Sequence, residues 1–154
     1  MLGPLRQRLP LRALILGCLL PDLIDKPLYY GLGPGPLLSG SRTFGHTGLF
    51  LLALLVAAVI VRRSVLWALF AGVATHLFLD VAGELVTGAD PETSIRLAIC
   101  WPAFGGRFPL AHFETLVEHL RLTAQSAWVW TGEIAGAAIL LHAWWRRHRA
   151  DQSV

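Results

Sequence analysis

The stretch T-G-L-F-L-L-A-L-L-V-A-A-V-I-V, residues 47–61, is followed at once by Arg62 and Arg63. It holds no charged residue, and with a little of its flanks it reaches roughly the 20 residues that a helix needs to cross a bilayer. A second apolar stretch, residues 65–82, begins directly after the two arginines, and only its later part carries ionisable side chains. Together they predict two membrane-spanning helices joined by a tight basic turn.

The composition of the whole chain also indicates a membrane protein. Of its 154 residues 55% are hydrophobic and 15% are charged, and the mean hydropathy is +0.56, whereas soluble domains carry about 25% charged residues. No linker, low-complexity tract or repeat divides the sequence, so residues 1–154 are expected to form a single membrane-embedded domain. Cys18 and Cys100 define neither a disulfide framework nor a metal-binding spacing.

Two more apolar stretches lie at the ends of the chain. Residues 9–24 end within the motif P-D-L-I-D-K-P (21–27). Its two prolines bracket two aspartates and are expected to stop the helix. Residues 126–145 are apolar except for Glu133 and His142, and they end in tryptophans and arginines, a composition typical of an anchor at the membrane interface. Each stretch predicts one further span.

The remaining segments predict less regular structure. Residues 28–42 are rich in Gly and Pro and predict a loop, and residues 83–109 predict an irregular lid over one end of the bundle. Residues 110–122 have apolar side chains at helical spacing with charged ones between them, which favours an amphipathic helix at the interface. The predicted fold class is therefore all-α, with about four transmembrane helices plus an interfacial helix.

The basic residues predict the topology of the bundle. Arginines flank the apolar stretches near residues 6–12, at 62–63 and at 146–149. By the positive-inside rule all three groups are cytoplasmic, so both termini are expected in the cytoplasm. The basic residues do not interleave with exposed aromatic residues, which argues against a nucleic-acid partner. A basic start before a short apolar run is also typical of a signal peptide, but the acidic motif follows directly without a polar tether.

This topology brings ionisable residues from three segments to the outer end of the bundle. They are Asp22, Asp25, His46, His76 and Asp80. Asp22 and Asp25 are three residues apart, and His76 and Asp80 are four apart, so each pair lies on one helix face. An aspartate within a membrane costs roughly 2.5 to 3.5 kcal/mol on insertion scales, so such residues usually pair or perform a function. A mixed set of imidazoles and carboxylates suits one or two divalent ions, zinc first, with manganese or magnesium as alternatives.

Each of these residues also has a simpler interpretation. A histidine in an apolar helix, such as His76, is often hydrogen-bonded to a neighbouring carbonyl. Asp25 could form a surface ion pair with Lys26, while Asp22 could end one helix and His46 could open the next. The metal hypothesis depends on their convergence from separate segments.

Glu133 lies deep within the last apolar stretch, and three roles stay open for it. It could be a further ligand, a catalytic general base, or a buried glutamate paired with a polar group of a neighbouring helix. The weaker candidates are Glu84, His112, Glu114 and His119.

Four motifs occur in a fixed order along the chain. They are G-C-L-L-P-D-L-I-D (17–25), R-T-F-G-H-T-G (42–48), A-T-H-L-F-L-D-V (74–81) and C-W-P-A-F-G (100–105). In combination they resemble the YdjM-like family of bacterial and archaeal inner-membrane proteins, described as LexA-regulated, membrane-bound, metal-dependent hydrolases. The resemblance covers residues 17–104 and implies a multi-pass protein of the inner membrane.

The resemblance also implies site residues. The family motif L-P-D-x-D falls on Pro21, Asp22 and Asp25, with the second aspartate one place later, and the family helix H-x-x-x-D falls on His76 and Asp80. That helix is also similar to one in zinc-dependent phospholipase C proteins.

The second family motif, H-R-x-x-T-H-S, matches Arg42, His46 and Thr47, but Ser41 stands where the family often has a histidine. The leading hypothesis is a membrane-bound hydrolase in which the metal activates water and Arg42 neutralises charge on a phosphate oxygen of a lipid or lipid-linked substrate. The alternatives are a component of metal or proton transport, which the lack of polar residues after Thr47 disfavours, and an inert scaffold with a structural metal.

Overall fold

A computed structural model describes most of the chain. The described residues are 9–32, 39–88, 90–103, 105–106, 108–110 and 115–132, together with 134, 136, 138, 141, 142 and 145. They form helices and no strand, which confirms the all-α prediction. The chain consists of two compact units, Met1–His112 and Phe113–Val154. That it forms a single domain stays a prediction.

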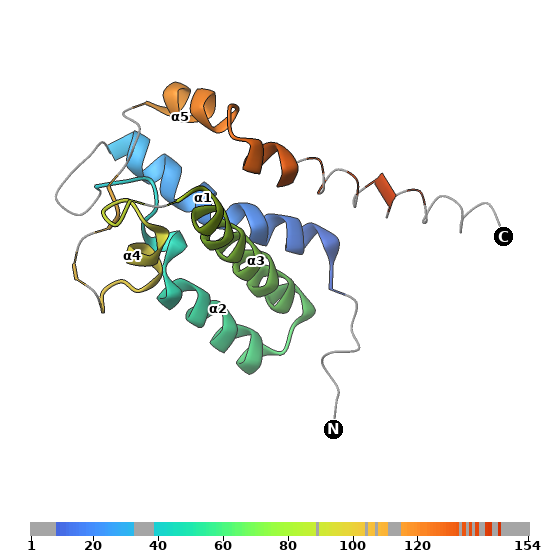
Figure 1. The fold of residues 1–154 in the computed structure, drawn as a ribbon. Helices are drawn as coiled ribbons and strands as arrows, with labels where there is room; N and C mark the ends of the chain where they lie inside the picture. The colour runs from blue at the N-terminus through green and yellow to red at the C-terminus, as the bar shows by residue number, and fades with distance from the viewer. Residues whose placement is uncertain are drawn as a thin grey trace. The chain divides into compact units, whose positions relative to one another are not determined.

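The described residues of the first unit form three long helices and two short ones (Figure 1). They are α1 (Leu11–Leu32), the 3-10 helix η1 (Phe44–His46), α2 (Gly48–Val61), α3 (Ser64–Thr87) and α4 (Ile95–Ile99). Both α1 and α2 pack against α3, and η1 contacts α1, α2 and α4. The helix α3 is therefore the central element on which the rest of this unit is assembled.

The helix α1 is longer than the sequence predicts. It continues through Pro21 and Pro27, so the expected stop is wrong and residues 28–32, predicted as loop, are helical. A proline removes one intrahelical hydrogen bond, but this loss is tolerated where a neighbouring helix supports the chain. Here Gly17 packs so closely on α3 that an added Cβ would lie 2.5 Å from the carbonyl oxygen of Leu69. The acidic motif consequently lies within a helix instead of after one.

The helices α2 and α3 form a hairpin, as predicted. Thr47 caps the start of α2, because its hydroxyl oxygen accepts a hydrogen bond of 3.0 Å from the backbone N–H of Phe50. At the other end Arg62 adopts a left-handed conformation with φ 55° and closes the helix. The chain then enters α3 directly after Arg63, which confirms the tight basic turn.

The helix α3 extends further than residues 65–82. It continues to Thr87, so the first part of the predicted lid is helical instead of irregular. The lid also contains the short helix α4, which Ser94 caps by accepting a hydrogen bond from the backbone N–H of Arg96. Apolar side chains persist in α3 up to Leu85 and Val86.

Only α3, among the described residues, is both long and apolar enough to cross a membrane. It has 24 residues and a mean hydropathy of 1.8 over its apolar window, and at 1.5 Å per residue it is about 36 Å long. The hydrocarbon core is about 30 Å thick. The helix α2 has 14 residues, and α1 carries Asp22, Asp25 and Lys26 within its length. The described structure therefore supports one span where the sequence predicts about four.

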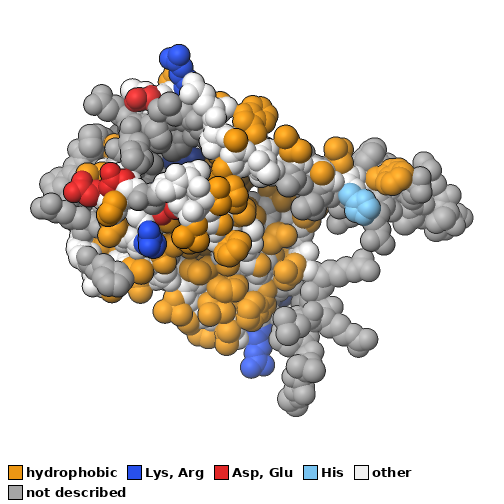
Figure 2. All heavy atoms as spheres, in the orientation of Figure 1, with side chains coloured by type: hydrophobic (Ala, Val, Ile, Leu, Met, Phe, Trp, Pro, Cys, Tyr) orange, Lys and Arg blue, Asp and Glu red, His pale blue; other side chains and the backbone are white. Residues whose placement is uncertain are grey.

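Large apolar side chains point outward from all three long helices. Those more than two-fifths exposed include Leu16, Leu19 and Leu23 of α1, Leu52, Val56 and Ile60 of α2, and Phe78, Leu79 and Leu85 of α3. Figure 2 shows hydrophobic side chains gathered over much of one face of this unit. A soluble monomer seldom exposes such a surface, whereas helices that face lipid do so normally.

The second unit begins with α5 (Leu116–Thr123), which starts later than the predicted amphipathic helix of residues 110–122. Helical residues follow from position 127, inside the last predicted span. The predicted site candidates Glu133, His112 and Glu114 lie outside the described residues, and so does the side chain of His119.

Candidate metal centre

The short helix η1 brings His46 against α1, and a glycine makes this close approach possible. A Cβ added to Gly45 would lie 2.8 Å from the carbonyl oxygen of Pro21, so a larger residue would push η1 away. The two segments are joined by hydrogen bonds to the carboxylate of Asp25. It accepts from the backbone N–H of Thr43 at 2.6 Å and from that of Gly45 at 2.8 Å.

Asp25 also contacts the His46 ring directly. Its Oδ2 lies 2.7 Å from Nδ1 of His46, and the side chains are 0% and 1% exposed. An ionised carboxylate can only accept hydrogen bonds, so Nδ1 carries the proton and donates it. The lone pair of His46 is therefore on Nε2, on the other side of the ring. A carboxylate behind a histidine fixes metal-binding imidazoles in many metalloproteins.

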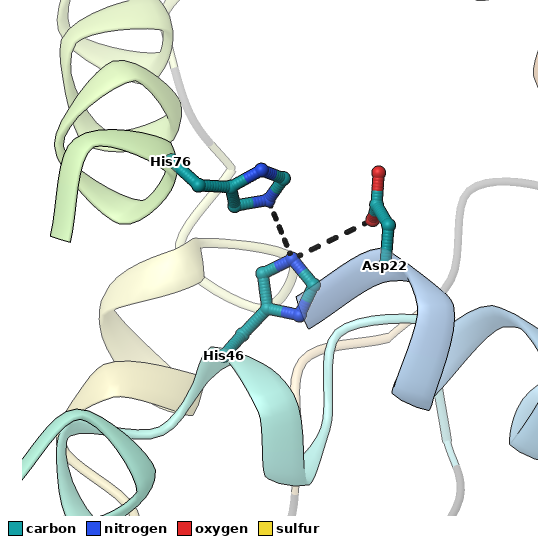
Figure 3. Close-up of side chains that lie close together, drawn as sticks. All are labelled: Asp22, His46 and His76. Carbon is teal, nitrogen blue, oxygen red and sulfur yellow. Dashed lines mark hydrogen bonds and ion pairs between the residues drawn. The ribbon is translucent and has the colours of Figure 1, made fainter. Parts of the chain in front are cut away.

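Nε2 of His46 faces two further candidate ligands. It lies 3.2 Å from Nε2 of His76 and 3.7 Å from Oδ1 of Asp22, as Figure 3 shows. One ligand atom from each of the three residues lies within 4.8 Å of the other two. The group thus joins α1, η1 and α3, three segments far apart in the sequence.

These separations fit the ligand shell of one divalent cation. Zinc lies about 2.0 to 2.2 Å from nitrogen and oxygen ligands, so the ligand atoms of a tetrahedral site are about 3.3 to 3.6 Å apart. The distances from His46 to His76 and Asp22, 3.2 and 3.7 Å, lie around that range. The mixture of two imidazoles and a carboxylate also suits a first-row divalent metal.

Asp80 lies at the rim of this group. Its Oδ2 is 3.8 Å from Nε2 of His46 and 3.9 Å from Nε2 of His76. The same oxygen is 3.5 Å from Nε of Arg42, whose side chain is 36% exposed. Asp80 is thus close enough to act as a further ligand, and Arg42 partly balances its charge.

Glu84 is oriented toward the lid and not toward the ligand group. Its Oε1 accepts hydrogen bonds from Nη1 of Arg42 at 3.0 Å and from the backbone N–H of Ile95 at 2.6 Å. Its Oε2 accepts from the hydroxyl of Ser94 at 2.8 Å. Glu84 therefore connects α3 with Arg42 and with the start of α4.

Lys26 forms its ion pair with Asp22, at 2.7 Å from Nζ to Oδ2. The simpler interpretation of the sequence paired Lys26 with its neighbour Asp25. Residues four apart share a helix face, whereas adjacent residues point in different directions. Asp25 is instead buried against η1, so its interpretation as a surface ion-pair residue is wrong.

A comparison with family models gives a match to the YdjM inner membrane protein family over residues 2–150. The chain belongs to this family. Its membership confirms the resemblance and the inner-membrane assignment. Neither the search of curated proteins nor the search of solved structures produced a match.

In this YdjM family member, four of the five predicted metal ligands converge. Asp22, His46 and His76 form the compact group, and Asp80 contacts both imidazoles from the rim. Asp25, also predicted as a ligand, lies behind His46 instead, because its two oxygens bond η1. Asp25 therefore contacts the Nδ1 side of His46, whereas the other candidates lie on its Nε2 side.

The sequence interpretation of this YdjM chain missed the roles of Gly45, Gly48 and Glu84. Gly48 packs on α4 as Gly45 packs on α1, since an added Cβ would lie 2.8 Å from the carbonyl oxygen of Ile99. Two glycines flanking a histidine in G-H-T-G are a signal for close backbone packing. For Glu84 the signal was its position four residues after Asp80 on α3, because residues four apart share a helix face.

Proposed function

We propose that the chain is a membrane-bound metal-dependent hydrolase. The observation that carries this proposal is the group of Asp22, His46 and His76, with Asp25 buried behind His46. Catalytic zinc sites characteristically have three protein ligands and leave a position for water or substrate. A divalent cation held there would supply Lewis-acid activation of a water molecule and of the scissile group.

The protein residues have distinct roles in this proposal. His46 and His76 bind the cation through Nε2, and Asp25 keeps the His46 lone pair directed at it. Asp22 supplies the third, anionic ligand, and Asp80 can add an oxygen from the rim, since zinc can expand to five ligands when water or substrate also binds. Zinc is the first candidate because of the two imidazoles, with manganese and magnesium as alternatives.

The proposed substrate is a phosphoester of a lipid or lipid-linked molecule. Arg42 supports this class, since its partly exposed guanidinium lies beside Asp80 and can form paired hydrogen bonds with phosphate oxygens. The depth of the ligand group along α3 also supports a lipid substrate. His76 is 11 residues from the end of α3 at Thr87, which is about 16 Å along a helix. A substrate must therefore enter the membrane or be anchored in it.

The proposal includes a multi-pass topology with both termini in the cytoplasm and the site in the outer half of the membrane. The motivating observation is the turn between α2 and α3, because Arg62 and Arg63 lie at this turn whereas His46 precedes the other end of α2 and Asp80 lies in the far half of α3. Single cysteines introduced at Ser64 and at Glu92, in a variant whose Cys18 and Cys100 are replaced by serine and labelled from outside intact cells, test this orientation. Labelling at position 64 without labelling at 92 would reverse it.

The function is tested on purified protein by metal analysis followed by a screen of phospholipids and polyprenyl phosphates. We expect bound metal and hydrolysis of one of these classes, and we expect His76→Ala to lose both. His142→Ala is the matched control, because His142 is exposed in the second unit. Bound metal without hydrolysis of any phosphoester would reject the hydrolase in favour of a structural metal. Activity that survives His76→Ala would reject the site.

A further inference from the structure

We infer that the site holds a single divalent cation and that Lys26 supplies the second positive charge, next to that cation, for an anionic substrate group. This inference rests on the proposed function and deepens it. Hydrolases of phosphoesters often use two metal ions about 3.5 to 4 Å apart, which together balance the charge of the phosphoryl group. The hydrogen-bond partners of Asp25, Glu84 and Asp22 favour one ion over two.

Both oxygens of Asp25 are already engaged in buried hydrogen bonds. Oδ2 accepts hydrogen bonds from the backbone N–H of Thr43 and from the ring of His46, and Oδ1 accepts from the backbone N–H of Gly45. All of these bonds are buried. A metal at Asp25 would have to enter this fully buried contact between α1 and η1 and compete with these donors, which is costly.

Glu84 is committed in the same way. Both of its oxygens accept hydrogen bonds, Oε1 from Arg42 and Ile95 and Oε2 from Ser94. Its side chain is 13% exposed, so water does not readily replace these donors. A second ion at this end of the site would therefore detach the start of α4 from α3.

Asp22 is the residue at which a second cation would be expected. In two-metal sites a carboxylate often bridges the ions, with one oxygen on each. Oδ1 of Asp22 faces Nε2 of His46 at 3.7 Å, on the side of the ligand group. Oδ2 instead bonds the ammonium group of Lys26 at 2.7 Å. Lys26 thus occupies the place of the second ion with a fixed positive charge.

The Lys26 side chain is also accessible to a ligand, because it is 29% exposed. An ammonium group has three N–H donors, and within the described residues one of them bonds Asp22. The others can donate to an anion that also contacts the metal. Arg42 lies beyond Asp80, in the segment before η1, and Lys26 lies on α1, so the two cationic side chains would hold a phosphoryl group from different parts of the chain.

A purely structural role for Lys26, as an ion pair along α1, predicts a different outcome. Loss of such a pair would weaken the binding of both zinc and phosphate, or leave both unchanged. Loss of a positive charge beside a cation site instead changes the affinities for the metal and for an anion in opposite directions. It removes repulsion from the metal, which should bind more tightly, and it removes attraction for an anion, which should bind more weakly.

The experiment measures zinc and inorganic phosphate binding to the full-length protein in lipid nanodiscs by titration calorimetry, with metal content checked by elemental analysis. We expect one zinc ion per chain in the wild type. Lys26→Gln should still bind one ion, about threefold to tenfold more tightly. Its zinc-loaded form should bind phosphate about tenfold more weakly. Lys26→Arg should retain phosphate binding, and Arg12→Gln, an exposed change on the same helix, should alter neither affinity.

Two zinc ions per wild-type chain would overturn the inference. So would Lys26→Gln with unchanged phosphate affinity, or with weaker zinc binding. Failure of the wild type to bind any divalent metal would instead reject the proposed function itself. If Lys26→Gln does not fold, the wild-type stoichiometry and the phosphate affinity of Lys26→Arg still decide the question.

Discussion

Nδ1 of His46 lies 2.7 Å from Oδ2 of Asp25, and neither side chain is accessible to solvent beyond 1%. This contact links the acidic motif of α1 to the histidine of η1 and turns Nε2 toward the other ligands. Since Asp25 also bonds the backbone of η1, one carboxylate fixes both the position of the segment and the orientation of the ring.

Asp25→Asn should therefore disturb metal binding without removing a ligand. The amide N–H₂ would face at least one backbone or ring donor, so His46 would lose its fixed orientation. Loss of such a partner typically weakens metal affinity about 10- to 100-fold, and the unpaired buried donor should lower the free energy of unfolding by about 1 to 3 kcal/mol. Zinc titration and thermal unfolding measure the two effects.

The control for that change is Asp90→Asn, because Asp90 is exposed and belongs to a turn outside the site. Zinc affinity equal to the wild type in the Asp25 variant would contradict the positioning role.

Gly45→Ala should separate η1 from α1. The new Cβ would lie 2.8 Å from the carbonyl oxygen of Pro21, which is backbone and cannot move aside easily. We expect lower thermal stability and at least tenfold weaker zinc binding, since a shift of about 1 Å is large compared with the tolerance of metal–ligand distances.

Gly31→Ala is the matched control on α1, where an added Cβ meets no atom within 4 Å. It should leave zinc binding unchanged and stabilise the helix by about 0.5 to 1 kcal/mol. Equal zinc affinities of the two variants would show that the close approach of η1 does not form the site.

Glu84→Gln should loosen the attachment of α4 to α3 without changing the affinity for zinc. The neutral side chain keeps one acceptor oxygen for the three donors that Glu84 now serves, so Arg42 and the start of α4 lose support. Limited proteolysis should cut residues 88–94 several-fold faster, and zinc affinity should change less than twofold. Glu92→Gln, an exposed neighbour, is the control. A large loss of zinc affinity would make Glu84 a ligand after all.

Removal of metal should lower thermal stability reversibly. A ligand present at 100 times its Kd stabilises the folded state by about 2.7 kcal/mol. Chelation should therefore lower Tm, and added zinc should restore it. His76→Ala should abolish the difference between the two conditions, whereas His142→Ala should preserve it. A zinc-dependent Tm in His76→Ala would locate the binding elsewhere in the chain.

Helix boundaries were less predictable than the helices themselves. The prolines of α1 suggested that the helix stops within residues 21–27, because sequence rules treat proline as a helix breaker. Packing of Gly17 against α3 and the bonds from Asp25 to η1 hold the chain in a helix beyond it. Likewise, Gly83 suggested a loop, yet α3 continues to Thr87. Both errors arise because tertiary contacts outweigh local propensity.

The amino-acid sequence by itself determined the all-helical class, the α2–α3 hairpin and the candidates His46, His76, Asp22 and Asp80. Apolar periodicity and the positions of arginines are local properties, and they report which segments can leave water. Only the tertiary structure decided that Asp25 faces Nδ1 of His46, that Glu84 holds the lid and that Lys26 pairs with Asp22. Those roles depend on which oxygen meets which donor, and this is set by the approach of helices to within a few ångströms.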